Sequence, residues 1–147
     1  MARSKYNVDS NKNKRTYNDI VFDSELEMKY YRDIVLPLYE DGEIIEFELQ
    51  KKYELQPSFK HENKTVRPIT YVADFFLKYK DGREEVIATK GMPDNVAKLK
   101  QKLMWYIYPD INLRWMAFSK IDGGWCDYDY IKKQRAIRKK NKQNKSK

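Results

Sequence analysis

Asp74 is the residue whose surroundings most suggest chemistry. It lies in the most strand-like segment of the chain, residues 69–79, directly before Phe75 and Phe76. A carboxylate among such neighbours loses much of its hydration, which is costly unless a partner compensates. A bound cation would compensate, and so would a buried ion pair with a nearby lysine, for which Lys90 at the end of the next predicted strand is the candidate.

The hairpin turn after this strand decides which side chains share a face with Asp74. A two-residue loop at Asp81-Gly82 would set Asp74 opposite Thr89. A three-residue loop that includes Lys80 places the glycine in the left-handed position of a type I turn with a G1 bulge, and sets Asp74 opposite Ala88. We predict the second register. In it, Asp74, residue 88 and residue 90 all point to one face of the sheet.

A glutamate on the first predicted helix is a further candidate. Glu27 shares a helix face with Tyr30, whereas Glu25 aligns with Lys29, so we predict that Glu27 points inward. The segment from Ser24 to Glu27 is also a capping-box sequence, in which the glutamate bonds back to the start of the helix. Both roles are open for Glu27 at this stage.

Taken in chain order, these residues resemble the motif of the PD-(D/E)XK nucleases. Asp74, followed after a hairpin by Ala88-Thr89-Lys90-Gly91, is similar to the Asp…(Asp/Glu)-x-Lys signature of that superfamily. The segment Phe22-Asp-Ser-Glu-Leu-Glu-Met-Lys-Tyr-Tyr31 resembles its first helix, which commonly supplies a glutamate. With Phe47-Glu-Leu-Gln50 and Tyr71-Val-Ala-Asp74, the resemblance spans residues 16–118. It is nearest to small phage proteins related to Holliday-junction resolvases.

The resemblance implies a metal-dependent DNA endonuclease, structure-specific and resolvase-like, that leaves a 5′-phosphate. It implies Mg²⁺, with Mn²⁺ as a substitute, held by Asp74, the residue at position 88, Glu27 and Thr89. Lys90 would orient the attacking water and stabilise charge that builds on the phosphate. A homodimer is implied as well, because two symmetric cuts across a junction need two active sites. Five aromatic residues could cover a dimer face or belong to the core: Trp105, Tyr106, Tyr108, Trp115 and Trp125.

Position 88 departs from the pattern, because Ala88 stands where the family has Asp or Glu. Three explanations are open: an engineered substitution, a naturally inactive DNA-binding relative, and an accidental match in which Ala88 is an ordinary small core residue. Intact Glu27, Asp74 and Lys90 favour the first. We expect this chain to bind DNA but hardly to cut it. The alternative is a non-catalytic DNA-binding or replication-accessory protein on an inert nuclease fold.

Positive charge is concentrated at the two ends of the chain. The net charge is +8, with +3 in residues 1–19 and +9 in residues 132–147, which leaves −4 for residues 20–131. We interpret these segments as a flexible basic arm, a basic tail and a nuclease domain between them. Basic segments strengthen binding to polyanions by releasing counterions, although lysine-rich ends also keep a chain in solution. The predicted DNA-contacting residues are Lys98, Gln101, Lys102, Lys132, Lys133, Arg135, Arg138, Lys139 and Lys140.

The rest of the composition excludes several classes of protein. No apolar run approaches the length of a membrane span, and the N-terminus lacks the apolar core of a signal peptide. The single Cys126 cannot form an internal disulfide, and His61 lies among charged residues. We therefore expect a cytoplasmic protein with no membrane partner, in a bacterial host if it is phage-encoded.

Hydrophobic periodicity predicts an α/β fold. Helices are expected from about residue 24 to 36, where Pro37 should end the first, over 94–107, and from about 127 into the tail. Strands are expected at 44–49, 69–79, 83–90 and 113–118, with an exposed loop at 57–68. The second of these strands should be covered on both sides. This order gives an αβββαβ core, and the resemblance implies a restriction-endonuclease-like sandwich: a central mixed sheet of four to five strands flanked by helices. The face of the 94–107 helix predicted to be buried comprises Val96, Leu99, Leu103 and Tyr106.

Overall fold

Strand β6 (Ile69–Tyr79) lies inside a five-stranded sheet. In the computed structural model, which describes residues 12–145, the strand order is β3 (Ile44–Gln56), β6, β7 (Glu84–Thr89), β8 (Leu113–Ser119) and β9 (Gly124–Asp127). Neighbouring strands are antiparallel except β7 and β8, which are parallel. A parallel pair needs a long crossover connection, and helix α3 (Asn95–Ile107) provides it. The predicted mixed sheet is confirmed, while β9 was not predicted.

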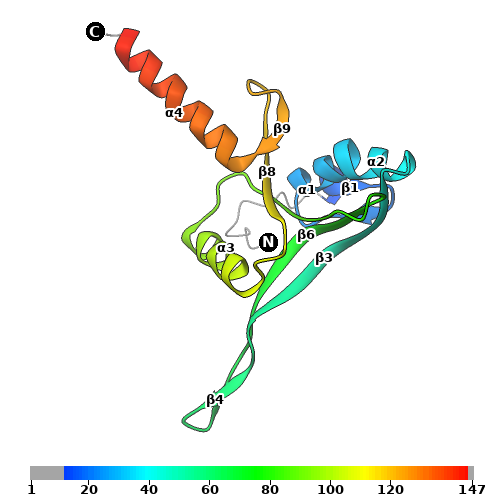
Figure 1. Cartoon of the computed structure of the whole chain (residues 1–147), viewed down its shortest axis with the longest axis vertical. Coiled ribbons are helices and arrows are strands. Elements are labelled where there is room, and N and C mark those ends of the chain that lie inside the picture. Colours follow the sequence, from blue (N-terminus) through cyan, green and yellow to red (C-terminus); the bar gives the residue numbers. More distant parts are fainter. Residues whose placement is uncertain (1–11, 146–147) are drawn as a thin grey trace.

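Helices cover both faces of this sheet (Figure 1). On one face, α1 (Glu25–Tyr30), a π-helical turn (Tyr31–Val35) and α2 (Leu36–Glu40) follow one another without a break. One core cluster joins the sheet to these helices: Phe22, Met28, Tyr30, Tyr31, Val35, Ile44, Phe75, Leu77, Ile87 and Met116. A second joins the sheet to α3: Tyr53, Tyr71, Ala73, Phe76, Val86, Ala88, Met104 and Trp115. Because β6 contributes to both clusters, the prediction that it is covered on both sides is confirmed.

The hairpin between β6 and β7 has the predicted three-residue register. Phe75 lies opposite Ile87, and the pairing continues in step to the turn. Gly82 has a φ of 91°, the left-handed conformation that the bulge requires, and its N–H donates to the carbonyl oxygen of Tyr79 at 2.9 Å. Continued by one residue beyond Phe75, this register sets Asp74 opposite Ala88.

Pro37 does not end the first helix, so that prediction was wrong. The helix continues to Glu40, and the π-helical turn before Pro37 explains how. The N–H of Leu36 donates to the carbonyl oxygen of Tyr31, five residues back instead of four. A new helical ladder thus begins at this point, and Pro37 lies in its first turn, where a missing N–H donor costs little.

Helix α3 buries a different face from the predicted one. Val96 and Leu99 are each 58% exposed and Tyr106 is 85% exposed, whereas Met104 is only 1% exposed. Ala97 packs against the same cluster as Met104. The buried face is therefore shifted by one residue, a rotation of roughly 100° about the helix axis. A small alanine beside a flexible methionine lets the helix approach the sheet closely. We call Val96, Leu99 and Tyr106 the exposed α3 stripe.

The segment before α1 is folded from residue 12 onward. A short 3-10 helix (Lys12–Arg15) leads into strands β1 (Thr16–Tyr17) and β2 (Ile20–Val21). Tyr17 and Ile20 pack against the first core cluster. The predicted flexible arm is therefore wrong for residues 12–19, and its remainder, residues 1–11, lies outside the described residues.

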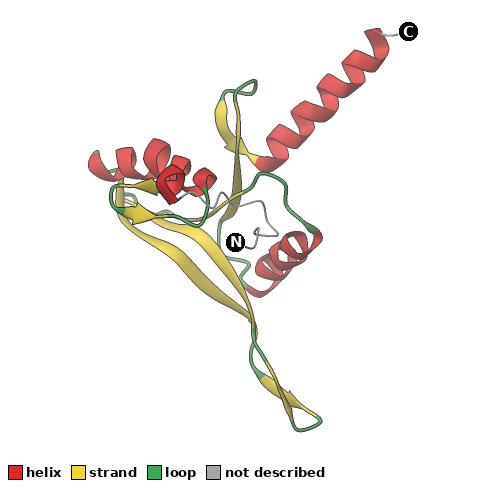
Figure 2. Cartoon of the chain, turned by 180° about the vertical axis from the view of Figure 1, so that it is seen from behind, coloured by secondary structure: helices red, strands yellow, loops and turns green. Residues whose placement is uncertain are grey.

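The C-terminal segment is a projecting helix. Helix α4 (Tyr128–Lys145) runs unbroken for 18 residues and extends away from the body (Figure 2). The sequence predicted a helix that frays into the basic tail. Ile131 is its buried residue. No helix in the described part of the chain is long and apolar enough to cross a membrane.

Residues 57–68, predicted to be an exposed loop, are exposed but form a hairpin. Strands β4 (Phe59–His61) and β5 (Lys64–Val66) pair with each other and continue the direction of β3 and β6 away from the body (Figures 1 and 2). We call residues 57–68 the β4–β5 ribbon.

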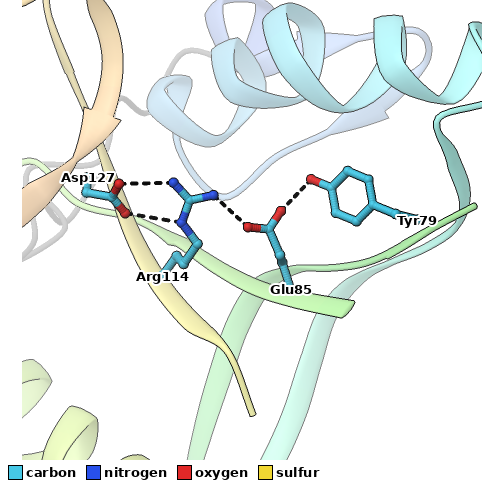
Figure 3. A network of polar contacts seen from close by, with 4 residues as sticks. All are labelled: Tyr79, Glu85, Arg114 and Asp127. Carbon is cyan, nitrogen blue, oxygen red and sulfur yellow. Dashed lines mark hydrogen bonds and ion pairs between the residues drawn. The ribbon is translucent and has the colours of Figure 1, made fainter. Parts of the chain in front are cut away.

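A row of polar side chains crosses the other end of the sheet (Figure 3). Glu85, only 4% exposed, accepts hydrogen bonds from the hydroxyl of Tyr79 and from Arg114, the latter at 2.6 Å. The Arg114 guanidinium also donates two bonds to the carboxylate of Asp127, at 3.0 and 3.1 Å. Burial and the bond to Glu85 raise the pKa of Tyr79. The row links β6, β7, β8 and β9, and thereby ties the start of α4 to the sheet.

Candidate active site

Asp74 lies where two strands of the sheet separate. The pairing of β6 with β7 ends at Phe75 and Ile87, while β7 continues beside β8 as far as Thr89. In this fork, Asp74 Oδ2 accepts a hydrogen bond from the N–H of Thr89 at 2.7 Å and another from its hydroxyl at 3.1 Å. A side-chain carboxylate thus takes the place that a backbone carbonyl would have in a regular ladder, and its position is fixed by two bonds.

Glu27 reaches the same fork from α1. Its side chain is buried, whereas Glu25 pairs with Lys29 at the surface at 3.3 Å, so the predicted inward direction of Glu27 is confirmed. Ser24 caps the helix by accepting the N–H of Glu27 at 3.1 Å. The carboxylate of Glu27 accepts a backbone hydrogen bond from Asp23 as well. The residue therefore takes part in the helix start and still brings its carboxyl group to the sheet.

The carboxyl groups of Glu27 and Asp74 lie within hydrogen-bond reach of each other. Burial raises the pKa of Glu27 to about 9, and the neighbouring Asp74 adds to the shift. Burial also raises the pKa of Asp74, opposed chiefly by the hydrogen bond from the N–H of Thr89. Near neutral pH, Glu27 thus holds a proton that it shares with Asp74. In such a pair the proton takes the place that a cation would otherwise fill.

Lys90 adds a half-buried cation to this pair. Its ammonium lies 5.1 Å from the centroid of the Trp115 ring. Burial lowers the pKa of Lys90, and the attraction of Asp74 and Glu27 opposes that shift. The backbone N–H of Lys90 donates to the carbonyl oxygen of Met116 at 2.8 Å, which fixes this end of the strand. The structure thus brings together the three charged residues that the sequence singled out.

Ala88 occupies the remaining position. It is 2% exposed, packs in the cluster that contains Trp115, and lies opposite Asp74 when the hairpin register is continued. Within residues 12–145, no group of three His, Cys, Asp or Glu side chains is placed to hold a metal. Two carboxylates suit a hard cation that keeps water ligands and takes phosphate oxygens from a substrate. Glu27 and Asp74 therefore fit as two ligands of such a cation.

Gln50 belongs to the site although the sequence analysis did not select it. Its Nε2 donates to Glu27 Oε2 at 3.0 Å. Gln50 also has a φ of 55° in the middle of a strand, in the left-handed region that costs a side chain about 1–2 kcal/mol. Its neighbours Leu49 and Lys51 pair with residues on either side of Asp74, so Gln50 faces the fork. Local strain of this kind concentrates at functional sites.

Comparison with known proteins shows to which protein family the chain belongs. Residues 3–122 match a protein family whose description is "Protein of unknown function (DUF1064)". The chain belongs to the DUF1064 family. The matched range of this DUF1064 protein contains Glu27, Gln50, Asp74, Ala88 and Lys90, and it ends before α4 begins. No curated protein matches the sequence.

The predicted DNA-contacting residues of the DUF1064 chain lie on α3 and α4. Lys98 and Lys102 are exposed on α3. Gln101 is half-buried and lines a cavity of about 100 Å³ together with Trp105 and Trp115, so it adjoins the site through Trp115. On α4, five of the predicted residues are exposed: Lys132, Lys133, Arg135, Lys139 and Lys140. Arg138 is held by Asp122 at 2.6 Å and is therefore partly committed to the fold.

Substitutions of Gln50 should separate its hydrogen bond from its backbone strain. Gln50→Gly loses the bond to Glu27 but adopts the positive φ freely, so its free energy of unfolding should lie within about 1 kcal/mol of the parent value. Gln50→Ala loses the bond and keeps the strain, and should be about 1–2 kcal/mol less stable than Gln50→Gly. Urea unfolding at neutral pH measures both. Equal stabilities for the two variants would show that the backbone at this position is not strained.

Glu27→Gln should change how stability depends on pH in the absence of divalent metal. The pKa of Glu27 in the folded chain, about 9, lies above its ordinary value of 4.5, so the folded chain keeps a proton that the unfolded chain releases. The stability from this group is complete below pH 4.5 and is lost as the pH rises towards 9. The amide has no such proton, so the variant should lose less stability over this range than the parent.

Chemical denaturation at a series of pH values measures the Glu27→Gln effect. Glu25→Gln is the matched control, because Glu25 lies on the same helix but pairs at the surface with Lys29. The control should keep the pH profile of the parent. A Glu27→Gln profile that runs parallel to the parent's would mean that Glu27 is ionised in the folded chain near neutral pH.

Proposed function

We propose that this site is that of a metal-dependent DNA endonuclease of the PD-(D/E)XK kind, in a chain whose Ala88 leaves it able to bind DNA but hardly to cut it. The observation that carries the proposal is the convergence of Glu27, Asp74 and Lys90 on one strand fork. Glu27 on α1, Asp74 on β6 and Lys90 directly after β7 bring two carboxyl groups and an ammonium together in a largely buried position. Such a cluster is costly unless it has a function.

Each residue of the site has a distinct part in the proposed hydrolysis. Asp74, fixed by Thr89, and Glu27, fixed by Gln50, would be the acidic ligands of Mg²⁺, or of Mn²⁺ as its substitute. The ion would supply polarisation of the scissile phosphate and acidification of water. Lys90 would orient the attacking water and donate to the charge that develops on the phosphate, leaving a 5′-phosphate on the product. The role of Thr89 as a direct ligand is part of the proposal.

Charge supports DNA as the partner. Helix α4 carries Lys and Arg around its surface and has one buried residue, so packing does not explain why it projects as an ordered helix. A basic helix of this kind strengthens binding to a polyanion by counterion release. An alanine at position 88 removes one negative charge that would face the DNA, which favours retention of binding in this chain.

We further propose a homodimer that acts on branched DNA, in the cytoplasm of a bacterial host. Symmetric cuts across a four-way junction require two sites related by a two-fold axis. The exposed α3 stripe, with Trp105 at 51% exposure beside it, is an apolar surface that a second copy would cover. Trp115, in contrast, is a buried core residue and does not belong to that surface.

A second candidate function is a non-catalytic DNA-binding or replication-accessory role on an inert nuclease fold. The packing of Ala88 favours it. Its methyl group is 2% exposed within an apolar cluster, as expected for an ordinary small core residue. In that case Glu27, Asp74 and Lys90 would form a structural charge cluster.

The Ala88→Asp protein distinguishes these functions when it is assayed with Mg²⁺ on a four-way junction, a flap and a linear duplex side by side. Nicking by the variant supports the nuclease, and a preference for the junction together with elution as a dimer supports the resolvase-like activity. Intact DNA binding without any Mg²⁺-dependent nicking would overturn the nuclease proposal and leave the accessory role.

A further inference from the structure

The β4–β5 ribbon is the part of the fold that packing explains least. All its residues are exposed except Val66, which is half-buried. An isolated two-stranded hairpin is at best marginally stable in water, because it buries little apolar surface. The ribbon nevertheless projects as an ordered pair of strands, at the opposite end of the molecule from α4 (Figures 1 and 2). The ribbon therefore adds little buried apolar surface to the core.

The ribbon has a well-defined tip. Glu62 and Asn63 form its two-residue turn with φ values of 48° and 65°, the pair of left-handed conformations found in type I′ hairpin turns. His61 lies opposite Lys64 directly before this turn. At the other end, the hydroxyl of Ser58 donates to the carbonyl oxygen of Val66 at 3.1 Å. Turns of this type match the twist of the flanking strands, so the turn is compatible with the paired strands on either side of it.

The ribbon is also a basic patch on an acidic body. It carries Lys60, Lys64 and Arg67 against the single acid Glu62, whereas residues 20–131 as a whole have a net charge of −4. Its three cationic residues are exposed, and none of them forms an ion pair within the described part of the chain. The charges are therefore available to an external anion.

We propose that the β4–β5 ribbon is a second DNA-contacting element, which enters a groove of duplex DNA next to the candidate site. The choice of DNA as partner rests on the proposed function. The major groove is about 12 Å wide and admits a two-stranded ribbon, whose strands lie about 4.8 Å apart. The exposed surface of the tip is cationic and polar, with Phe59 as its large apolar residue at 45% exposure. This composition fits a phosphate-lined groove better than an apolar protein surface.

The strands of the sheet set the distance between the ribbon and the site. Asp74 lies on β6 and Gln50 on β3, and these two strands lead towards the ribbon. Eleven residues separate Asp74 from Asn63, which at 3.3 Å per residue is at most roughly 36 Å. One turn of the DNA helix is about 34–36 Å long. A duplex whose backbone lies at the fork would therefore meet the tip within about one helical turn.

Paired charge neutralisation tests this inference. The ribbon variant is Lys60→Gln with Lys64→Gln. The control is Lys29→Gln with Lys80→Gln, which removes the same number of positive charges from α1 and the β6–β7 turn, where both lysines form surface ion pairs. Fluorescence anisotropy with a linear duplex of about 30 base pairs, about three helical turns, gives Kd at several salt concentrations. The ribbon variant should bind about tenfold more weakly at low salt, and its slope of log K against log salt should be smaller by about 1.8, two phosphate contacts at about 0.9 each. The control should keep the slope of the parent.

The outcomes separate this inference from the proposed function. If the parent binds the duplex and the ribbon variant binds it with the same Kd and salt slope, the ribbon does not contact DNA, while the proposed function stands. If the parent does not bind duplex or junction DNA at low salt, both the ribbon proposal and the proposed function are overturned. A ribbon variant that changes its elution volume but keeps its salt slope would assign the ribbon to contact with a second copy instead. Circular dichroism and thermal unfolding should match the parent, because the substituted side chains are exposed.

Discussion

Ala88→Asp should raise Mg²⁺-dependent cleavage of branched or duplex DNA by at least about 10³-fold over the parent chain, which corresponds to about 4 kcal/mol of activation free energy. Continued beyond Phe75, the hairpin register would set position 88 opposite Asp74, and the new carboxylate would then join Asp74 and Glu27 as a third oxygen ligand. A more complete ligand set fixes the ion against the scissile phosphate. Conversion of supercoiled plasmid to the nicked form, together with cleavage of a labelled junction, measures the gain.

The same substitution should make stability depend on Mg²⁺. A carboxylate at position 88 enters an apolar cluster, so without metal the variant should unfold at a lower temperature than the parent. Bound Mg²⁺ would compensate the charge and stabilise the folded chain in proportion to the logarithm of its concentration. Thermal unfolding in a Mg²⁺ titration should therefore show a steeper rise in Tm for the variant than for the parent.

Two further variants show which step fails if cleavage does not appear. Ala88→Asn has nearly the size of the aspartate variant without its charge, and should neither cleave DNA nor gain stability from Mg²⁺. Adding Lys90→Met to Ala88→Asp should abolish cleavage but keep the Mg²⁺-dependent rise in Tm, because Lys90 is proposed to act on water and phosphate. Metal-dependent stability in Ala88→Asp without cleavage would mean a metal site with another purpose. The absence of both would mean that the resemblance is accidental.

The sequence predicted the parts of the site that depend on local rules. The position of Gly82 in the turn was enough to choose the register of the hairpin, which the structure has as far as Phe75 and Ile87. Helical periodicity was enough to separate the inward Glu27 from the outward Glu25. Both inferences use only neighbours within a turn or a hairpin, where geometry follows directly from spacing.

The missed features depend on contacts between distant segments. Gln50 lies 23 residues from Glu27 in the sequence, and it makes this bond from a left-handed backbone conformation inside β3. The buried face of α3 follows from the shape of the sheet beneath it, which favours Ala97 and Met104 over the more hydrophobic stripe one residue earlier. Amphipathic periodicity shows that a helix has an apolar face, but it does not distinguish a face against the core from one exposed to a partner.

The ion pair between Glu85 and Arg114 also joins distant segments of the chain. Of the proposed substitutions, one that breaks this pair should lower the free energy of unfolding most. Glu85 is 5% exposed at its side chain, and Arg114, 29 residues away, provides the charge that compensates it. Arg114→Met would keep the apolar part of the side chain but leave a buried carboxylate with only the hydroxyl of Tyr79 as a partner. Breaking one side of a buried pair costs about 3–5 kcal/mol, and the lower end applies because a third of Arg114 is exposed.

A double-mutant cycle shows whether this loss comes from the unpaired charge. Arg114→Met with Glu85→Gln should regain part of the stability that Arg114→Met loses, because no buried charge is left unpaired. Lys29→Met is the control at an exposed pair on α1 and should cost about 0.5 kcal/mol or less. Urea unfolding of the parent, Arg114→Met, Glu85→Gln and the double variant gives the coupling between Glu85 and Arg114. If Arg114→Met cost no more than Lys29→Met, the polar row across the sheet (Figure 3) would not hold β8 and the start of α4 in place, and α4 would owe its position to Ile131 instead.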